Sequence, residues 1–457
     1  MSIQEQNQKD LTPFESIGLC FSGGGYRATS FSLGILSYLN RAELNGLPLL
    51  MHVKALSSVS GGTLTAVAFA SSQEKGQAFE DFYIQFFNFL NNDQLLKQAT
   101  DNMKDNALWK NNHKRRSFIN SFSIAYEQLF FKGSMQKLLN ANNGRPLRDV
   151  CFNSTEFSFG LAFRFQNSGE TGNYRLANNA LKDIWGEVKL ADAVASSSCF
   201  PIGFAPMIMP DDYFTDHKRP EYLAVKEQPY FDEGIGVMDG GIVDNQGIGS
   251  MVLIDRRRQS AGLSGLDLFF ICDVGSYKMD PWKMNKSGDG DSTPLNEKVL
   301  NLLKVLGLRW WYWALFVVGV LLMVLNSMEI FRGQAWPALY IVGGISTGLG
   351  LLLTVGGVVL TKIKAWGMAT LKSVYHKNVP EVMLENLDGL EKLDLSLIKR
   401  MITERLTSGM KMVNDVFLKQ IRRLNYDLIY SKNEYKNRII TATVYALNGK
   451  QTDQKKA

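Results

Sequence analysis

Residues 14–75 alternate between short apolar runs and longer segments in which hydrophobic positions repeat at helical spacing. Residues 16–21 and 53–57 have the length and composition of buried strands, while 28–39 and 61–71 have the periodicity of helices. Strands that alternate with helices indicate βαβ units, which form a parallel sheet. The pattern therefore predicts an α/β fold with a mainly parallel central sheet.

A helical insertion is predicted over residues 76–145. Within it, Phe79, Phe82, Phe86 and Leu90 fall at helical spacing and form one apolar face. An apolar face of this kind must pack against another element, so we expect the insertion to cap the sheet.

Further strands are predicted beyond the insertion. Residues 156–166 are predicted to form one strand, and residues 266–274 are apolar almost throughout, as in a central buried strand. A long amphipathic helix is predicted near 402–421, followed by an alternating strand pattern over 438–446. Because a single strand is unstable alone, we expect the last one to return to the sheet formed earlier in the chain.

Two apolar segments interrupt this globular pattern. Residues 305–325 contain one charge, Arg309, and residues 335–360 contain none. Each reaches the roughly 20 apolar residues that a helix needs to cross the hydrocarbon core of a membrane. Aromatic residues cluster near their ends, as at a membrane interface. We therefore expect a transmembrane hairpin; the alternative is a buried hairpin in a large soluble core.

Composition and charge narrow the class of protein. Lys and Arg number 50 against 44 Asp and Glu, and the basic clusters are short and scattered, which argues against nucleic acid as a partner. The polar N-terminus lacks a secretory signal, so we expect the soluble part to be cytosolic. No metal or cofactor is expected, because no cysteine pair has metal-ligand spacing, and buried reduced thiols are predicted. The cysteines are Cys20, Cys151, Cys199 and Cys272.

Candidate chemistry begins at a strand-to-helix junction. The sequence Ser58-Val59-Ser60-Gly61-Gly62 lies between an apolar strand and a helix, which is the setting of a G-x-S-x-G nucleophile elbow. Ser58 replaces the first glycine of that pattern, and Gly62 supplies the second. By itself the match is weak, because Ser and Gly are also common helix caps.

Three consecutive glycines occupy an earlier strand-to-helix junction. The backbone amides of Gly23, Gly24 and Gly25 could donate to a developing oxyanion, assisted by the positive end of the following helix. A phosphate cradle is the competing interpretation. It is disfavoured because the Lys-Ser/Thr pair of a P-loop is missing and Ala28 occupies the third glycine position of a dinucleotide motif.

A serine nucleophile needs a base. Asp239 follows a short apolar strand and precedes two glycines, and an Asp bonded to a Ser hydroxyl can act as base in a dyad. Asp244 is the second choice and is more typical of a turn or loop anchor. The histidines lie in no motif-like setting; they are His52, His113, His217 and His376.

In this order the motifs resemble those of the patatin-like phospholipases, whose pattern is G-G-G-x-R, G-x-S-x-G and D-G-[GA]. The matching stretches are Gly23-Gly24-Gly25-Tyr26-Arg27, the Ser60 elbow and Asp239-Gly240-Gly241, and Ala195 to Pro201 resembles the family's A-S-x-x-x-P block. The resemblance covers about residues 14–250. It implies a three-layer patatin-like fold.

The resemblance also implies the roles of the site residues. Ser60 is expected to be the nucleophile and Asp239 its base, with Gly23, Gly24, Gly25 and Arg27 contributing the oxyanion hole. Ser58 is small enough to keep the elbow. The aromatic-rich stretch 79–131 and the charged loop 211–226 are candidate lids or acyl-chain walls, although plain packing and plain surface are equally good explanations.

The expected domain organisation combines this resemblance with the hydropathy pattern. Residues 14–275 are expected to form the patatin-like catalytic domain, followed by a linker over 276–300. A transmembrane hairpin is expected over 301–365, and residues 366–450 supply helices and a strand that returns to the catalytic domain.

The sequence thus predicts a membrane-anchored serine hydrolase that cleaves acyl esters of membrane glycerophospholipids. A catalytically silent lipid-binding scaffold or sensor is the alternative, and a soluble esterase is a third option. Positive residues precede the first apolar segment and follow the second, and these two ends lie on the same side of the membrane. The catalytic domain and both termini are therefore expected in the cytoplasm. Small residues in the second apolar segment, including Gly344 and Gly348, predict a homo-oligomer.

Overall fold

The computed structural model describes residues 14–275, 310–378 and 395–445, apart from gaps at 93, 111, 140–144, 202, 331–332 and 334. The chain divides into two compact units. Met1–Asp280 and Met410–Ala457 form the first, which we call the sheet unit. Pro281–Gly409 forms the second, the hairpin unit. The predicted linker, the start of the first apolar segment, residues 379–394 and residues 446–450 lie outside the described residues.

Among the described residues, eight strands of the sheet unit form one mixed sheet in the order β10-β9-β1-β4-β5-β8-β7, with β6 paired to β5. The strands from β10 to β5 are parallel to one another, whereas β6, β7 and β8 pair in antiparallel fashion. This confirms the predicted α/β fold with a mainly parallel sheet. The strands are β1 (Ile17–Phe21), β4 (Val53–Val59), β5 (Asp149–Glu156), β6 (Ala162–Gln166), β7 (Met207–Met209), β8 (Ile235–Asp239), β9 (Leu268–Gly275) and β10 (Ile439–Tyr445). A separate two-stranded ribbon joins β2 (Glu43–Leu44) to β3 (Leu47–Pro48).

Helices cover both faces of the sheet, as a parallel sheet requires. Along β1, Leu19 and Phe21 belong to the larger buried cluster, whereas Cys20 between them belongs to the smaller one. Side chains of a strand alternate between faces, so the two clusters lie on opposite sides of the sheet. The first contains side chains of α1 (Gly25–Arg41), α2 (Gly61–Glu74) and α9 (Leu190–Ser197); the second contains side chains of α12 (Ile248–Ser260) and α18 (Leu418–Tyr430).

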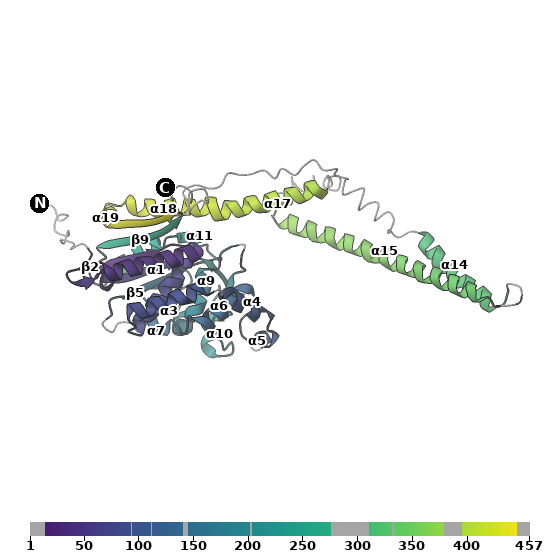
Figure 1. Cartoon of the computed structure of the whole chain (residues 1–457), viewed down its shortest axis with the longest axis horizontal. Coiled ribbons are helices and arrows are strands. Elements are labelled where there is room, and N and C mark those ends of the chain that lie inside the picture. Colours follow the sequence, from purple (N-terminus) through teal and green to yellow (C-terminus); the bar gives the residue numbers. More distant parts are fainter. Residues whose placement is uncertain are drawn as a thin grey trace, which may run out of the picture. The chain divides into compact units, whose positions relative to one another are not determined.

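Residues 76–145 contain five helices within their described part. Phe82 and Phe86 of α3 are buried in the larger cluster, as their helical spacing predicts. Figure 1 shows these helices at the opposite side of the unit from α18 and α19. The five helices are α3 (Phe79–Asn91), α4 (Gln94–Lys104), α5 (Asn106–Lys110), α6 (Phe118–Leu129) and α7 (Gln136–Leu139). Shorter helices elsewhere are α8 (Asn179–Ile184), α10 (Pro220–Lys226), α11 (Gly241–Asp244) and α19 (Asn433–Lys436).

The prediction of one continuous strand over 156–166 is wrong. Glu156 ends β5, and the chain turns back into β6, which pairs antiparallel with β5. The buried Glu156 carboxylate accepts the backbone N–H groups of Ser158, Phe159 and Leu161 at 2.7–3.2 Å, and Gly160 has a φ of 66°. Side-chain capping and a glycine thus create a turn inside an otherwise apolar run.

The C-terminal strand β10 lies beside β9 at the edge of the sheet, although the hairpin unit separates them in sequence. Thr441 pairs with Ile271 and Thr443 with Asp273 in a regular parallel register. Tyr435, just before β10, is fully buried against this edge. The sheet unit is therefore built from chain on both sides of the hairpin unit.

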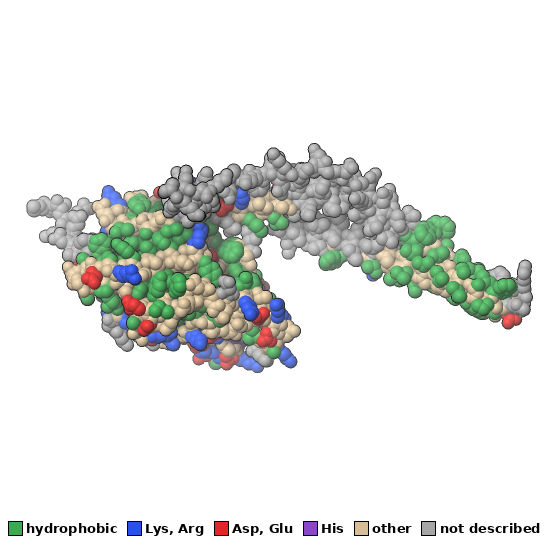
Figure 2. Space-filling model, in the orientation of Figure 1, with side chains coloured by type: hydrophobic (Ala, Val, Ile, Leu, Met, Phe, Trp, Pro, Cys, Tyr) green, Lys and Arg blue, Asp and Glu red, His purple; other side chains and the backbone are tan. Residues whose placement is uncertain are grey.

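The hairpin unit contains α14 (Trp310–Ser327) and α15 (Pro337–Asn378), followed in the chain by α17 (Leu395–Lys411). Two stretches, Trp310–Ser327 and Pro337–Val359, are long and apolar enough to cross a membrane, and most of their side chains are not buried. Hydrophobic side chains cover the described surface of this helix pair in Figure 2. The turn is fixed by Asn326, whose side chain bonds the backbone N and O of Trp336 at 2.9 Å each.

Glycines allow the two helices of the hairpin to approach closely. A Cβ on Gly350 would lie 2.6 Å from the Phe316 backbone nitrogen, and one on Gly319 would lie 2.6 Å from the Thr347 nitrogen. Gly344 and Gly348 are different, because a Cβ there meets nothing within 4 Å. The small residues of α15 therefore lie on two faces, and only one of them packs against α14.

Candidate active site

Ser60 occupies a sharp turn between β4 and α2. Its backbone has φ 51° and ψ −124°, a positive-φ conformation that is uncommon for a residue with a side chain. The neighbouring glycines permit the turn, since a Cβ on Gly61 would lie 2.0 Å from the Gly25 oxygen and one on Gly62 would lie 2.8 Å from the Phe21 oxygen. This is the strand-turn-helix geometry of a nucleophile elbow.

A chain of hydroxyl groups supports the elbow from beneath. The Ser60 N–H donates to Ser197 Oγ at 3.0 Å, and Ser197 Oγ donates to the Asn153 oxygen at 2.6 Å. The Ser58 and Thr63 hydroxyls are 3.0 Å apart, and those of Thr63 and Ser197 are 2.8 Å apart. Because the Ser197 hydroxyl donates its hydrogen to the Asn153 oxygen, it can only accept from Thr63. The Thr63 hydroxyl therefore donates to Ser197, and the Ser58 hydroxyl donates to Thr63. The serine in place of the first glycine is thus buried and hydrogen-bonded.

Asp239 ends β8 with its carboxyl group buried beside Ser60. Its Oδ1 accepts the Gly241 N–H at 2.8 Å, and Asp239 lines the same cavity as Ser60. Burial raises the pKa of Asp239 from 3.8 to about 6, while the neighbouring Ser60 side chain and the Gly241 N–H act in the opposite direction. The carboxylate is therefore mostly ionised at neutral pH yet much more basic than an ordinary Asp.

The three glycines of the first loop are not equivalent. Gly23 is buried, and its N–H donates to the Asn245 oxygen at 2.9 Å, so it is not available to a substrate. The prediction that the Gly23 amide belongs to an oxyanion hole is corrected accordingly. Gly24 and Gly25 are exposed at φ 145° and 59° and line the same pocket as Ser60. Within the described part of the chain, their N–H groups have no backbone acceptor.

Arg27 is not brought into the site. It is exposed on the first turn of α1, whereas Tyr26 and Thr29 of the same helix line the pocket. Positions 27 and 29 are about 200° apart around a helix, so Arg27 points away when Thr29 points in. The cavity lining therefore gives no support to the expected contribution of Arg27 to the oxyanion hole, which stays a prediction.

The histidines described in the sheet unit also lie away from Ser60. His52 immediately precedes β4, and Ser60 follows the other end of that seven-residue strand, a span of roughly 20 Å. The rings of His113 and His217 are 6.0 Å apart and do not line the pocket. Burial, with a smaller contribution from nearby Lys114, lowers the pKa of His113 to about 4.

Asp244 anchors a helix. Its carboxylate accepts the N–H groups of Ile248 at 3.0 Å and Gly249 at 2.8 Å, at the start of α12, and the Asn425 side chain at 3.0 Å. It is buried and does not line the pocket. This agrees with its expected place as a loop anchor and leaves Asp239 as the acidic residue at the elbow.

A cavity of about 360 Å³ opens above Ser60 and Asp239. Of the described residues that line it, only Asp239 carries a charge, and most of the rest are apolar. The helix α6 and the loop after α9 supply a cluster of aromatic rings, in which Phe204 contacts Phe122 and Phe200 at centroid distances of 5.5 and 5.4 Å. No residue of the loop 211–226 lines the cavity. The apolar lining is Leu64, Ile119, Phe122, Tyr126, Phe200, Pro201, Phe204, Ile242, Val413 and Leu418.

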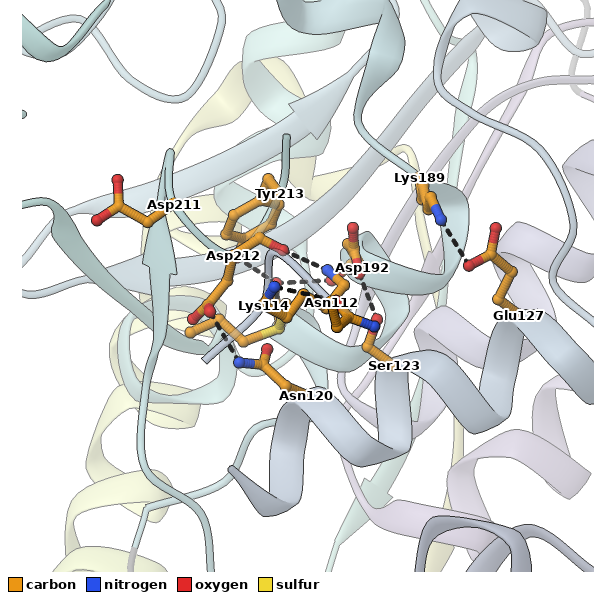
Figure 3. A network of polar contacts seen from close by, with 12 residues as sticks. Asn112, Lys114, Asn120, Ser123, Glu127, Lys189, Asp192, Asp211, Asp212 and Tyr213 are labelled. Atoms are coloured by element: carbon orange, nitrogen blue, oxygen red, sulfur yellow. Dashed lines mark hydrogen bonds and ion pairs between the residues drawn. The ribbon is translucent and has the colours of Figure 1, made fainter. Parts of the chain in front are cut away.

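A buried polar network fixes α6 against α9, as Figure 3 shows. Lys114 Nζ forms an ion pair with Asp192 Oδ1 at 2.8 Å, and the Ser123 hydroxyl donates to the same oxygen. Asn120 Nδ2 donates to Asp212 Oδ1 at 2.8 Å. Because α9 carries Ser197, the helix that forms the aromatic wall is tied to the helix that supports the elbow.

Sequence reasoning missed Asn153, which links the elbow to the Asp239 turn. Its Nδ2 donates to Ser57 Oγ and to the Ser58 oxygen at 3.0 Å each, and its Oδ1 accepts from Ser250 at 2.6 Å. A Cβ on Gly240 would lie 2.4 Å from the Asn153 oxygen. An amide side chain directly after the apolar run Val150-Cys151-Phe152 was the available signal, because a buried polar group must find partners.

Comparison with known protein families identifies the part of the chain that contains this site. The family model of the patatin-like phospholipases matches residues 19–252, about half of the chain. The matched residues include the glycine loop, Ser60 and Asp239. A search of curated proteins finds no match.

Proposed function

Because the chain belongs to the patatin-like phospholipase family, we propose that it is a membrane-anchored serine hydrolase that cleaves acyl esters of glycerophospholipids. The observation that carries this proposal is that Ser60, held in a strained elbow, and the buried carboxylate of Asp239 line one cavity. The apolar cavity above them supports an acyl chain as the group that binds there.

In the proposed reaction, Ser60 Oγ attacks the ester carbonyl carbon while Asp239 accepts its proton. The N–H groups of Gly24 and Gly25 donate to the oxyanion that forms. Collapse of this intermediate breaks the bond to the lipid alcohol, which takes the proton back from Asp239 and leaves an acyl ester on Ser60. Asp239 then accepts a proton from water, which attacks the ester, and returns it to Ser60 Oγ as the acyl bond breaks, so that the fatty acid and free Ser60 are formed.

Membrane anchoring is the second part of the proposal. It rests on the length, apolar composition and exposure of Trp310–Ser327 and Pro337–Val359. Positive residues precede the first segment (Lys298, Lys304, Arg309) and follow the second (Lys362, Lys364, Lys372). By the positive-inside rule, both termini and the sheet unit lie in the cytoplasm. Labelling of single cysteines at each end in intact cells tests this, and labelling from outside contradicts it.

We also propose that the protein forms a homo-oligomer, in which a second copy of the chain is the partner. One small face of α15 packs on α14, whereas Gly344 and Gly348 lie on a face where a Cβ would meet nothing within 4 Å. Small residues allow close approach of helices in lipid, so this face is the proposed contact with a second protomer.

The test uses the purified full-length protein with vesicles of mixed glycerophospholipids and mass spectrometry of the products. Wild type is expected to release fatty acid and lysophospholipid, and Ser60→Ala is expected to release neither. The lipids that disappear identify the head group and the acyl position. Vesicle binding without any release by wild type would support the alternative function, a silent lipid-binding scaffold or sensor.

A further inference from the structure

Part of the cavity wall comes from outside the family-matched residues. Val413 and Leu418 line the cavity with Ser60 and Asp239, whereas the family match ends at residue 252. Both residues belong to the sheet unit, which the chain re-enters after the hairpin unit. We propose that the segment 412–418, here called the C-terminal wall, sets the length of acyl chain that the site accepts. This inference rests on the proposed hydrolase function.

The local helix geometry explains how two residues five positions apart reach one cavity. Met412–Phe417 is a π-helix inserted between α17 and α18. In an α-helix, Val413 and Leu418 would point about 140° apart. A π-helix links residues five apart by hydrogen bonds and so places them one above the other, and such insertions occur often at functional sites. The π-helix thus turns both side chains toward the cavity.

The C-terminal wall is held in place by polar contacts of α18. The Arg422 guanidinium pairs with Asp273 of β9 at 2.6 Å, and the Tyr426 hydroxyl donates to the same carboxylate at 2.7 Å. Asn425 donates to Asp244, which anchors α12, at 3.0 Å. A wall fixed at these points has a defined distance from Ser60, and a defined distance is what selection of chain length requires.

The chemistry of the cavity specifies what kind of group the wall contacts. Ile119, Phe122 and Tyr126 of α6 are apolar partners in the same lining, and Asp239 is the charged residue among the described lining residues. An uncharged hydrocarbon chain fits such a lining, whereas a phosphate head group does not. A larger side chain at Val413 or Leu418 shortens the space for that chain, and a smaller one extends it.

The experiment measures kcat/KM for nitrophenyl esters of four to sixteen carbons with the full-length protein in detergent micelles. For Val413→Trp and Leu418→Trp, the ratio of long-chain to short-chain kcat/KM is expected to fall at least about tenfold, because a few methylene contacts are worth that much. For Val413→Ala the ratio is expected to rise. Leu424→Trp is the matched control, since Leu424 lies on α18, is 62% exposed and does not line the cavity.

An unchanged ratio in both tryptophan variants overturns the proposal, whether kcat/KM stays at the wild-type level or falls equally for all chain lengths. Binding of fluorescent fatty acids of different length to Ser60→Ala provides a readout that does not need turnover. In that background, Val413→Trp is expected to weaken long-chain binding at least about tenfold, and unchanged binding contradicts the C-terminal wall. If wild type hydrolyses no ester while this binding difference persists, the hydrolase function fails and the wall stands.

Discussion

The hydroxyl of Ser197 accepts the backbone N–H of Ser60 at 3.0 Å and donates its own hydrogen bond to the Asn153 backbone oxygen at 2.6 Å. A residue of α9 therefore holds the amide of a turn whose φ of 51° is strained. The elbow is thus defined by a contact between segments that are far apart in sequence.

Ser197→Ala is expected to lower kcat by roughly 10- to 100-fold, because a buried N–H loses its acceptor and the elbow relaxes. Ser60 itself remains, so labelling by a fluorophosphonate probe should slow rather than disappear. Ser264→Ala, on an exposed loop, is the control and should have wild-type kcat. Wild-type kcat in Ser197→Ala would show that the elbow does not depend on this contact.

The rate of acyl release is expected to depend on the ionisation of Asp239. Its pKa is raised from 3.8 to about 6 by burial, and only the ionised form can accept the Ser60 proton. Activity should therefore be nearly full at pH 7 and fall about tenfold for each pH unit below 6. A kcat/KM profile measures this, and a profile that stays flat down to pH 5 would exclude Asp239 as the base.

Asp239→Asn is expected to stabilise the protein while it removes activity. Since the folded-state pKa is raised, the group contributes stability below pH 3.8 that is lost as pH rises through about 6. At neutral pH the ionised wild-type carboxylate therefore costs about 3 kcal/mol, at 1.36 kcal/mol per pH unit. Thermal unfolding in detergent should give Asp239→Asn a higher Tm at pH 7, with the difference disappearing near pH 4. Equal Tm values for wild type and Asp239→Asn at pH 7 would contradict a buried, ionised carboxylate at Asp239.

The two small faces of α15 are expected to respond differently to substitution. Gly350→Leu should disrupt the helix pair and lower Tm, because a Cβ there already lies 2.6 Å from the Phe316 nitrogen. Gly348→Leu should keep Tm but weaken the proposed oligomer, because its face is open. Light scattering in detergent reports the oligomeric state. A monomeric wild type, or an oligomer that Gly348→Leu leaves intact, would contradict the proposed role of the Gly348 face in oligomerisation.

The features that the sequence could predict are those that depend on local backbone conformation. Glycines beside Ser60 and at the loop of Gly24 and Gly25 are visible in sequence, because only glycine allows these turns and close approaches. Such patterns depend on neighbours in the chain, and for the same reason βαβ units could be recognised by their hydrophobic periodicity.

Contacts between distant segments could not be predicted in the same way. The Gly23 N–H cannot donate to a substrate because it donates to the Asn245 backbone oxygen. These two residues become neighbours only when the chain folds. Val413 reaches the cavity through a π-helix, which has no clear sequence signature. The turn after Glu156 was missed because a carboxylate closes it inside an apolar run.

The central claim is that Ser60 and Asp239 form the catalytic dyad. The most direct test is fatty-acid release from phospholipid vesicles by wild type, Ser60→Ala, Asp239→Asn and His52→Ala, each purified at full length. Ser60→Ala should have no turnover, Asp239→Asn should lose at least about 10⁴-fold, and His52→Ala should keep the wild-type rate. Near-normal release by Asp239→Asn together with loss in His52→Ala would contradict the dyad and require a histidine base.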